Sequence, residues 1–226
     1  MPFSEHPRRS RAAKRPGRIA RICHLSAWLG SVLLSLAPAR ATIVGLNQIV
    51  TPEIQPAGVL ALSAQAQHAT IGNSQQLQAE LGITPRFELA WFQGLTPGEG
   101  FFASEFNLVQ TGPHLLTVGF INWSTRGHPP QPVLEYGYYL AADHFSAGVI
   151  YANHESELLL GYRHQFTDRI QLSADFQSGS ANSSTLGVVY NITPALSINP
   201  AVYRTNSHPH HLLGYVVLTW NLTLWK

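Results

Sequence analysis

The stretch LGVVYNITPALSINPAVYRTN, residues 186–206, contains the unit that decides the fold. Apolar and polar residues alternate along it, the pair Thr193-Pro194 interrupts the alternation, and the alternation then resumes. Successive side chains of a β-strand point to opposite faces, so each half predicts a strand and the Thr-Pro pair predicts the turn between them. The stretch is therefore expected to be a β-hairpin with one apolar face and one polar face.

The same period of two recurs from residue 57 to the end of the chain, and no stripe at helical spacing competes with it. In GVLALSAQAQH, for example, Leu60 and Leu62 alternate with Ala61 and Ser63. Several runs reach about ten residues, the length that a tilted strand needs to cross a bilayer. The twelve strands that we predict span residues 57–68, 73–83, 86–94, 101–110, 114–123, 132–142, 145–153, 157–166, 169–178, 182–192, 195–204 and 211–224.

The connections between these strands are of two kinds that alternate along the chain. One set consists of tight turns at Thr84, Thr111, Asp143, Thr167 and Thr193. The other set is longer and polar, namely ATIGN, QGLTPGEG, STRGHPPQ, GSAN and TNSHPHH, with NHES as its short member. Short turns on one side and longer loops on the other are typical of bacterial transmembrane barrels. We therefore expect an all-β fold, an antiparallel up-and-down transmembrane β-barrel of twelve strands over residues 57–226.

A soluble β-sandwich or lipocalin-like barrel would also alternate, because one of its faces is buried and the other solvated. Three features favour the membrane barrel: the even number of long strands, a content of charged residues of only 12%, and aromatic residues near the predicted strand ends, where interface girdles lie. These aromatic residues are Trp91, Trp123, Tyr138, Tyr151, Tyr190, Tyr203, Trp220 and Trp225.

At this level the chain resembles small bacterial outer-membrane β-barrels of the porin-like class. The resemblance implies a place in the outer membrane, a lipid bilayer around the barrel, and insertion by the barrel-assembly machinery. One departure concerns the end of the chain, LTWNLTLWK. Such barrels usually end on an aromatic residue, whereas here Trp225 is penultimate, Lys226 is last, and the alternate apolar positions run through Leu224.

The first 41 residues predict a secretory signal peptide. A basic stretch is followed by the apolar run LSAWLGSVLLSLAPARA, which ends in small residues, and we expect cleavage after Ala41 or, as a second choice, after Ala39. Residues 42–56 contain Pro52 and Pro56, which disfavour a regular strand. This segment is expected either to enter the barrel as a plug or to lie in the periplasm.

Removal of the leader changes the charge of the chain. Eight basic residues and one acidic residue lie before residue 42, which leaves six basic and eleven acidic residues in the mature part. Nucleic-acid binding needs basic patches to displace counterions, so no nucleic-acid partner is expected. The one cysteine, Cys23, also lies in the leader, so stability must come from backbone hydrogen bonds and packing rather than from disulfides.

The polar face of the predicted strands supplies the candidate site. It carries five acids and one main cation: Glu80, Glu88, Glu105, Glu135, Asp175 and Arg163. Rings of carboxylates favour cations in a pore. The sequence thus predicts a monomeric, passive channel for small polar solutes or ions, with a preference for cations and no cofactor. The alternative is a closed structural barrel, because the lumen of a small barrel is often filled by its own side chains.

Two other functions rest on histidines. His208, His210 and His211 lie together in one predicted outer loop and offer imidazoles to a divalent metal such as zinc, copper or nickel. Twelve-stranded outer-membrane phospholipases use a serine activated by histidine, an arrangement for which His154 with Ser156, and His164, are the candidates here. The serine motif of that family is not found in the sequence, so a lipid hydrolase is the least favoured prediction.

Overall fold

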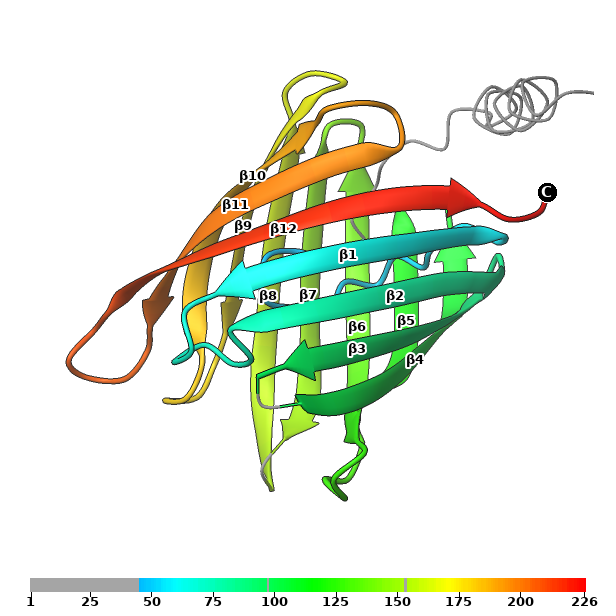
Figure 1. The fold of residues 1–226 in the computed structure, drawn as a ribbon. Coiled ribbons are helices and arrows are strands. Elements are labelled where there is room, and N and C mark those ends of the chain that lie inside the picture. Colours follow the sequence, from blue (N-terminus) through cyan, green and yellow to red (C-terminus); the bar gives the residue numbers. More distant parts are fainter. Residues whose placement is uncertain (1–44, 97, 153) are drawn as a thin grey trace, which may run out of the picture. The chain divides into compact units, whose positions relative to one another are not determined.

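The computed structural model describes residues 45–226 except residues 97 and 153, so the predicted leader lies outside the described residues. Twelve strands form a closed antiparallel barrel in up-and-down order (Figure 1). The strands are β1 (Val59–Gln67), β2 (Gln75–Thr84), β3 (Phe87–Leu95), β4 (Gly98–Thr111), β5 (His114–Ser124), β6 (Gln131–Leu140), β7 (Asp143–Ala152), β8 (Glu155–Gln165), β9 (Ile170–Gln177), β10 (Ser183–Asn191), β11 (Leu196–Thr205) and β12 (Leu212–Thr223). The twelve predicted strands and their order are confirmed.

The barrel is closed by its first and last strands. β1 pairs with β12 continuously, from Val59 opposite Thr223 to Gln67 opposite Tyr215. Each other strand pairs with its neighbours in sequence. In the part of the chain that the structure describes, no helix is long and apolar enough to span a bilayer.

The two faces of the wall follow the alternation of the sequence. On β1, Ala61 and Ser63 are buried inside, whereas Leu62 and Ala64 are exposed on the outside. Large apolar side chains are exposed all round the outer face, as on β7, β8, β10 and β12 (Val149, Leu160, Leu186 and Leu218). An apolar band of this kind matches the hydrocarbon core of a bilayer.

The connections differ from the prediction at one place. The stretch QGLTPGEG was expected to form a long loop, but β3 ends at Leu95 and β4 begins at Gly98, which pairs with Leu95. Within this extended ladder Gly100 leaves room for the ring of Trp91, which a Cβ at that position would meet. The longer loops that remain, residues 68–74, 125–130, 178–182 and 206–211, all lie at one end of the barrel, which we call the long-loop end.

The alternation predicts Tyr203 on the polar inner face, although it also counts among the aromatic residues near strand ends, and the structure has it on the inner face. It lies on the inner face of β11 and only 1% of it is exposed. Its hydroxyl donates a hydrogen bond to the carbonyl oxygen of Asn47. By contrast, the side chains of Trp91, Trp123, Tyr151, Tyr190 and Trp220 are exposed on the barrel surface.

The position of a residue on the outer face predicts how much an introduced charge lowers stability, because the cost depends on its depth in the bilayer. Leu160 lies in the middle of β8 and Leu212 is the first residue of β12. We expect Leu160→Arg to lower the free energy of unfolding by about 2–4 kcal/mol and Leu212→Arg by about 1 kcal/mol or less, because the cost of an arginine on the lipid face falls toward the interface. Urea unfolding in phospholipid vesicles measures both. Equal losses would contradict a membrane-spanning orientation of β8.

Candidate functional site

Residues 45–56, which we call the inner segment, lie inside the barrel and behind β1 in Figure 1. Leu46, Asn47, Ile49, Thr51 and Gln55 of this segment are all buried. Of the two positions that the sequence left open, the structure therefore has the segment in the lumen. It leads into β1 through Gly58, whose φ of +78° favours glycine, and the Gly58 amide donates to the Gly82 carbonyl oxygen (2.8 Å).

One side of the inner segment packs on an apolar part of the wall. Leu46 and Ile49 contact a buried cluster formed by inner positions of β6, β7 and β8, namely Val133, Ile150, Ala152 and Leu159. The alternation predicted a polar inner face, so this apolar patch is a finding of the structure. Burying a leucine or isoleucine fully contributes about 1.5–3 kcal/mol, and this contact therefore favours the segment inside the lumen over a segment in water.

Asn47 anchors the other side of the segment through polar contacts. Its backbone N–H donates to Asp175 Oδ2 on β9 (2.7 Å). Its side-chain Nδ2 donates to Thr185 Oγ1 on β10 (2.9 Å), and its Oδ1 accepts from Asn199 Nδ2 on β11 (3.1 Å). Its Oδ1 also accepts from Ser173 Oγ (3.0 Å). Asn47 is 4% exposed, so these hydrogen bonds replace the ones that it would form with water in an open segment.

Glu53 forms the ionic contact of the segment. It pairs with Arg163 on β8, and His144 Nδ1 lies 3.4 Å from Glu53 Oε1. Burial alone raises the pKa of Glu53, but the hydrogen bond from His144 and the charge of Arg163 outweigh burial and lower the pKa to about 2. Glu53 is therefore ionised at neutral pH. Arg163 was predicted to face the acids of the wall, whereas its partner is this carboxylate of the inner segment.

The far end of the segment is held by β3 and β5. The backbone N–H of Gln55 donates to Glu88 Oε2 (2.5 Å). The hydroxyl of Thr117 donates to the Pro52 carbonyl oxygen (2.7 Å). With the contacts of Asn47, Leu46 and Glu53, these bonds connect the segment to β3 and to β5–β11.

Inward-facing glycines shape the wall around the segment. A Cβ at Gly82 would meet the backbone of Gln55, a Cβ at Gly161 would meet the side chain of Leu46, and a Cβ at Gly187 would meet the side chain of Asn47. The segment therefore lies closer to these strands than any larger residue would allow. Sequence reasoning missed this role, because a glycine within an alternating strand gives no sign of what approaches it.

All six of the predicted lumen residues lie on the inner face, but they have different surroundings. Asp175, Glu88 and Arg163 contact the inner segment. Glu88 and Glu105 are direct cross-strand partners, and Gly119 and Gly148 leave room on β5 and β7 for the side chains of Glu105 and Glu135. Glu80 lines a large cavity in the lumen. The four glutamates therefore gather on the β2–β6 side of the barrel, whereas Asp175 lies on β9.

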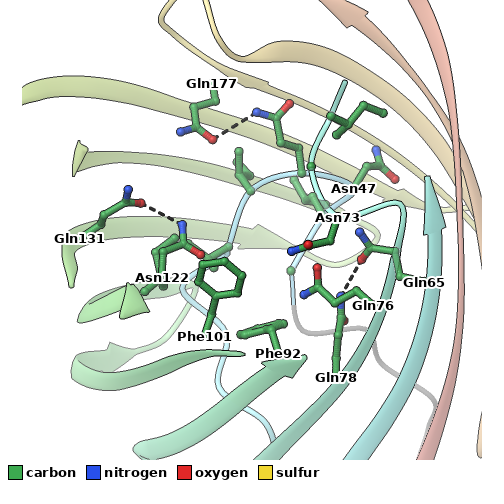
Figure 2. Close-up of a pocket in the computed structure, with 18 of the residues that line it drawn as sticks. Asn47, Gln65, Asn73, Gln76, Gln78, Phe92, Phe101, Asn122, Gln131 and Gln177 are labelled. Carbon is green, nitrogen blue, oxygen red and sulfur yellow. Dashed lines mark hydrogen bonds between the residues drawn. The ribbon is translucent and has the colours of Figure 1, made fainter. Parts of the chain in front are cut away.

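This cavity has a volume of about 810 Å³ and is bounded on one side by residues 45–50 of the inner segment. Its wall includes residues of the β1–β2 and β5–β6 loops, so it lies toward the long-loop end. We call it the vestibule. Figure 2 shows side-chain amides from several strands around it, with Phe92 and Phe101 beside them. The labelled amides are Asn47, Gln65, Asn73, Gln76, Gln78, Asn122, Gln131 and Gln177.

The histidine candidates are only partly brought together. The rings of His208 and His210 lie 4.1 Å apart, but among residues 45–226 without 97 and 153 no three His, Cys, Asp or Glu side chains form a group that would hold a metal. His154 and Ser156 lie at one end of β8. His164 lies at the other end, where its Nδ1 is 2.7 Å from Asp143 Oδ1. The three hydrolase candidates therefore do not form one site.

Comparisons with known proteins agree on the fold. No protein-family model matches the chain, and no curated protein matches its sequence. Among solved structures, the KdgM porin is similar with a TM-score of 0.53 and 8% identity, over 72% of this chain and 98% of that one. The NanC porin is similar with a TM-score of 0.50 and 5% identity, over 72% and 100%. The outer membrane phospholipase A from Escherichia coli gives 0.44 and 11%, over 81% and 100%. The chain has the fold of porin-like outer-membrane barrels.

Asn47 gives a test of how the segment is held. We expect Asn47→Ala to weaken its hold by about 2–3 kcal/mol, because Ser173, Thr185 and Asn199 lose a buried partner. Residues 42–226 contain no cysteine, so Ile49→Cys in a protein of these residues supplies a single buried label. Labelling by a membrane-impermeant maleimide should become about 30-fold to 150-fold faster in the Asn47→Ala background. Asn191→Ala, whose amide bonds a turn carbonyl instead, is the control and should leave the rate unchanged.

The Glu53 contact predicts a dependence on pH. Because the pKa of Glu53 is lowered from 4.5 to about 2, its ionisation stabilises the inserted segment fully above pH 4.5 and that contribution is lost as the pH falls to about 2. The difference in ion conductance between Glu53→Gln and the parent protein in a planar bilayer should be constant from pH 7 to pH 5 and then shrink, because the segment of the parent protein loosens as Glu53 is protonated. Glu53→Gln should already show the higher conductance at pH 7 and a smaller rise in acid. Identical pH curves for both proteins would show that Glu53 does not hold the segment.

Proposed function

We propose that the chain is an outer-membrane channel for small polar solutes, that it prefers cations over anions, and that the inner segment limits its flow. The observation that carries the proposal is a polar lumen in which acids outnumber the neighbouring cation. Glu80, Glu105 and Glu135 line the inner face, and the charge of Arg163 is already balanced by Glu53. Rings of carboxylates in a pore favour cations.

The inner segment determines how much can pass. A solute entering from the long-loop end reaches the vestibule first and then meets residues 45–50, which form its floor. Movement further along the lumen requires either space beside the segment or a shift of the segment. A small unitary conductance that increases when the segment is loosened is therefore the expected behaviour. A barrel that stays silent in both states would instead be a structural element of the membrane.

The proposal includes delivery to the outer membrane. The basic and apolar leader of residues 1–41 supports export, and the apolar outer face supports residence in lipid. The proposal that the barrel-assembly machinery inserts the chain is supported by the alternating apolar positions of β12, including Val216, Leu218 and Trp220.

Charge selectivity is the decisive test of the channel. Mature protein, residues 42–226, is refolded in detergent and added to a planar bilayer under a salt gradient, and the reversal potential gives the ratio of cation to anion permeability. We expect cation selectivity, and we expect Glu105→Gln to lower the permeability ratio by about twofold or more, since one acidic group of the lumen is removed. Glu155→Gln, at the exposed start of β8, is the matched control.

The results separate the alternatives. Steady cation-selective steps that weaken in Glu105→Gln but not in Glu155→Gln support the channel. Unselective or anion-selective steps would overturn the cation preference and leave the pore. A folded barrel whose electrophoretic mobility shifts on heating, but which carries no current even with Asn47→Ala, would overturn the channel itself.

A further inference from the structure

The vestibule is lined by side-chain amides that hold one another in place. Gln78 Nε2 donates to Gln65 Oε1 (2.6 Å), Asn122 Nδ2 donates to Gln131 Oε1 (2.9 Å), and Gln48 Nε2 donates to Gln177 Oε1 (3.2 Å) (Figure 2). An amide has two N–H donors and an oxygen with two lone pairs, so each pairing uses only part of this capacity. The vestibule therefore presents oriented donors and acceptors side by side.

Aromatic rings lie among these amides. Phe92 and Phe101 are cross-strand partners on β3 and β4, and both line the vestibule. Tyr203 and Tyr215 line it from β11 and β12, with ring centroids 5.3 Å apart. Aromatic side chains combine a large apolar surface with a fixed geometry, and tyrosine adds a polar end. The lining thus offers apolar faces as well as hydrogen-bonding groups.

The charged groups of the vestibule lining further restrict the class of ligand that can bind. Its acidic and imidazole side chains are Glu80, His128 and His154, and the lining residues include no lysine or arginine. Carboxylate and phosphate ligands are recognised mainly by arginine and lysine, so an acidic solute would meet Glu80 without a compensating cation. A solute that carries both donors and acceptors, and no negative charge, fits these residues better.

We propose that the vestibule is a binding site for a neutral saccharide. Each sugar hydroxyl is at once donor and acceptor and matches the amide pairs, while the C–H faces of the pyranose rings match Phe92 and Phe101. The volume of about 810 Å³ lies within the range of about 300–1,000 Å³ usual for small-molecule sites and accommodates a short oligosaccharide. The proposal rests on the proposed function in that the saccharide is the solute that the channel admits.

Equilibrium binding tests this independently of ion flow. Folded mature protein in detergent is titrated calorimetrically with maltotriose as a neutral trisaccharide and with trigalacturonic acid as an acidic one of the same length. We expect maltotriose to bind, and trigalacturonic acid to bind at least about tenfold more weakly. Gln78→Leu and Phe101→Ala should each weaken maltotriose binding by about tenfold, since each removes one type of contact.

Gln171→Leu is the matched control, because Gln171 is an inward glutamine of β9 that does not line the vestibule. The Gln171→Leu variant should bind maltotriose with the affinity of the parent protein. Heat-dependent mobility in gels shows whether every variant is folded. Tighter binding of trigalacturonic acid, equal loss in Gln171→Leu, or no binding of either trisaccharide to a folded, conducting barrel would overturn the saccharide proposal alone. Binding of maltotriose to a barrel that carries no current even with Asn47→Ala would uphold the binding site and overturn the channel.

Discussion

The constraint on which the rest of the structure depends is the hydrogen bonding of the backbone in lipid. No water is available in the hydrocarbon core, so every N–H and C=O of a spanning segment must find a partner within the protein, and a sheet can achieve this only by closing on itself. The pairing of β1 with β12 completes that closure. Closure also creates an interior whose width is set by the number of strands. With twelve strands, the wall side chains leave room for a further stretch of chain, and residues 45–56 occupy it.

Two kinds of interaction hold the inner segment in the lumen, namely apolar packing and hydrogen bonding. Leu46 and Ile49 pack against the apolar patch on β6–β8, as residues of a small hydrophobic core do. Asn47 forms hydrogen bonds with polar residues on β9–β11. A segment held by both kinds of contact has a defined orientation in the barrel, because turning it over would set apolar side chains against carboxylates. The same arrangement leaves the long-loop end of the lumen to the amides of the vestibule.

The strands could be predicted from the sequence because their information is local. Period-two alternation, as in residues 186–206, fixes which side chains face inward without knowledge of any other strand. The position of residues 45–56 could not be predicted in this way. This stretch has no period, and the partners of Asn47 lie 126 to 156 residues further along the chain. The apolar inner patch was missed for a related reason: Ile150 and Leu159 match an outward-facing pattern as well as an inward-facing one until the segment that covers them is known. Asn47 and Gln48, two polar residues between Leu46 and Ile49, are a local sign that the segment has two sides.

The short link between the inner segment and β1 has a consequence for the kinetics of the lumen. Only Ala57 and Gly58 separate the segment from the strand that seals the barrel, and the Gly58 amide is itself bonded to β2. A displaced segment therefore stays at a high effective concentration beside its own site and returns by an intramolecular step. The state of the lumen is then a property of each single barrel. It does not depend on how many copies the membrane holds or on any soluble blocker, and its time course is that of a tethered loop rather than that of a diffusing ligand.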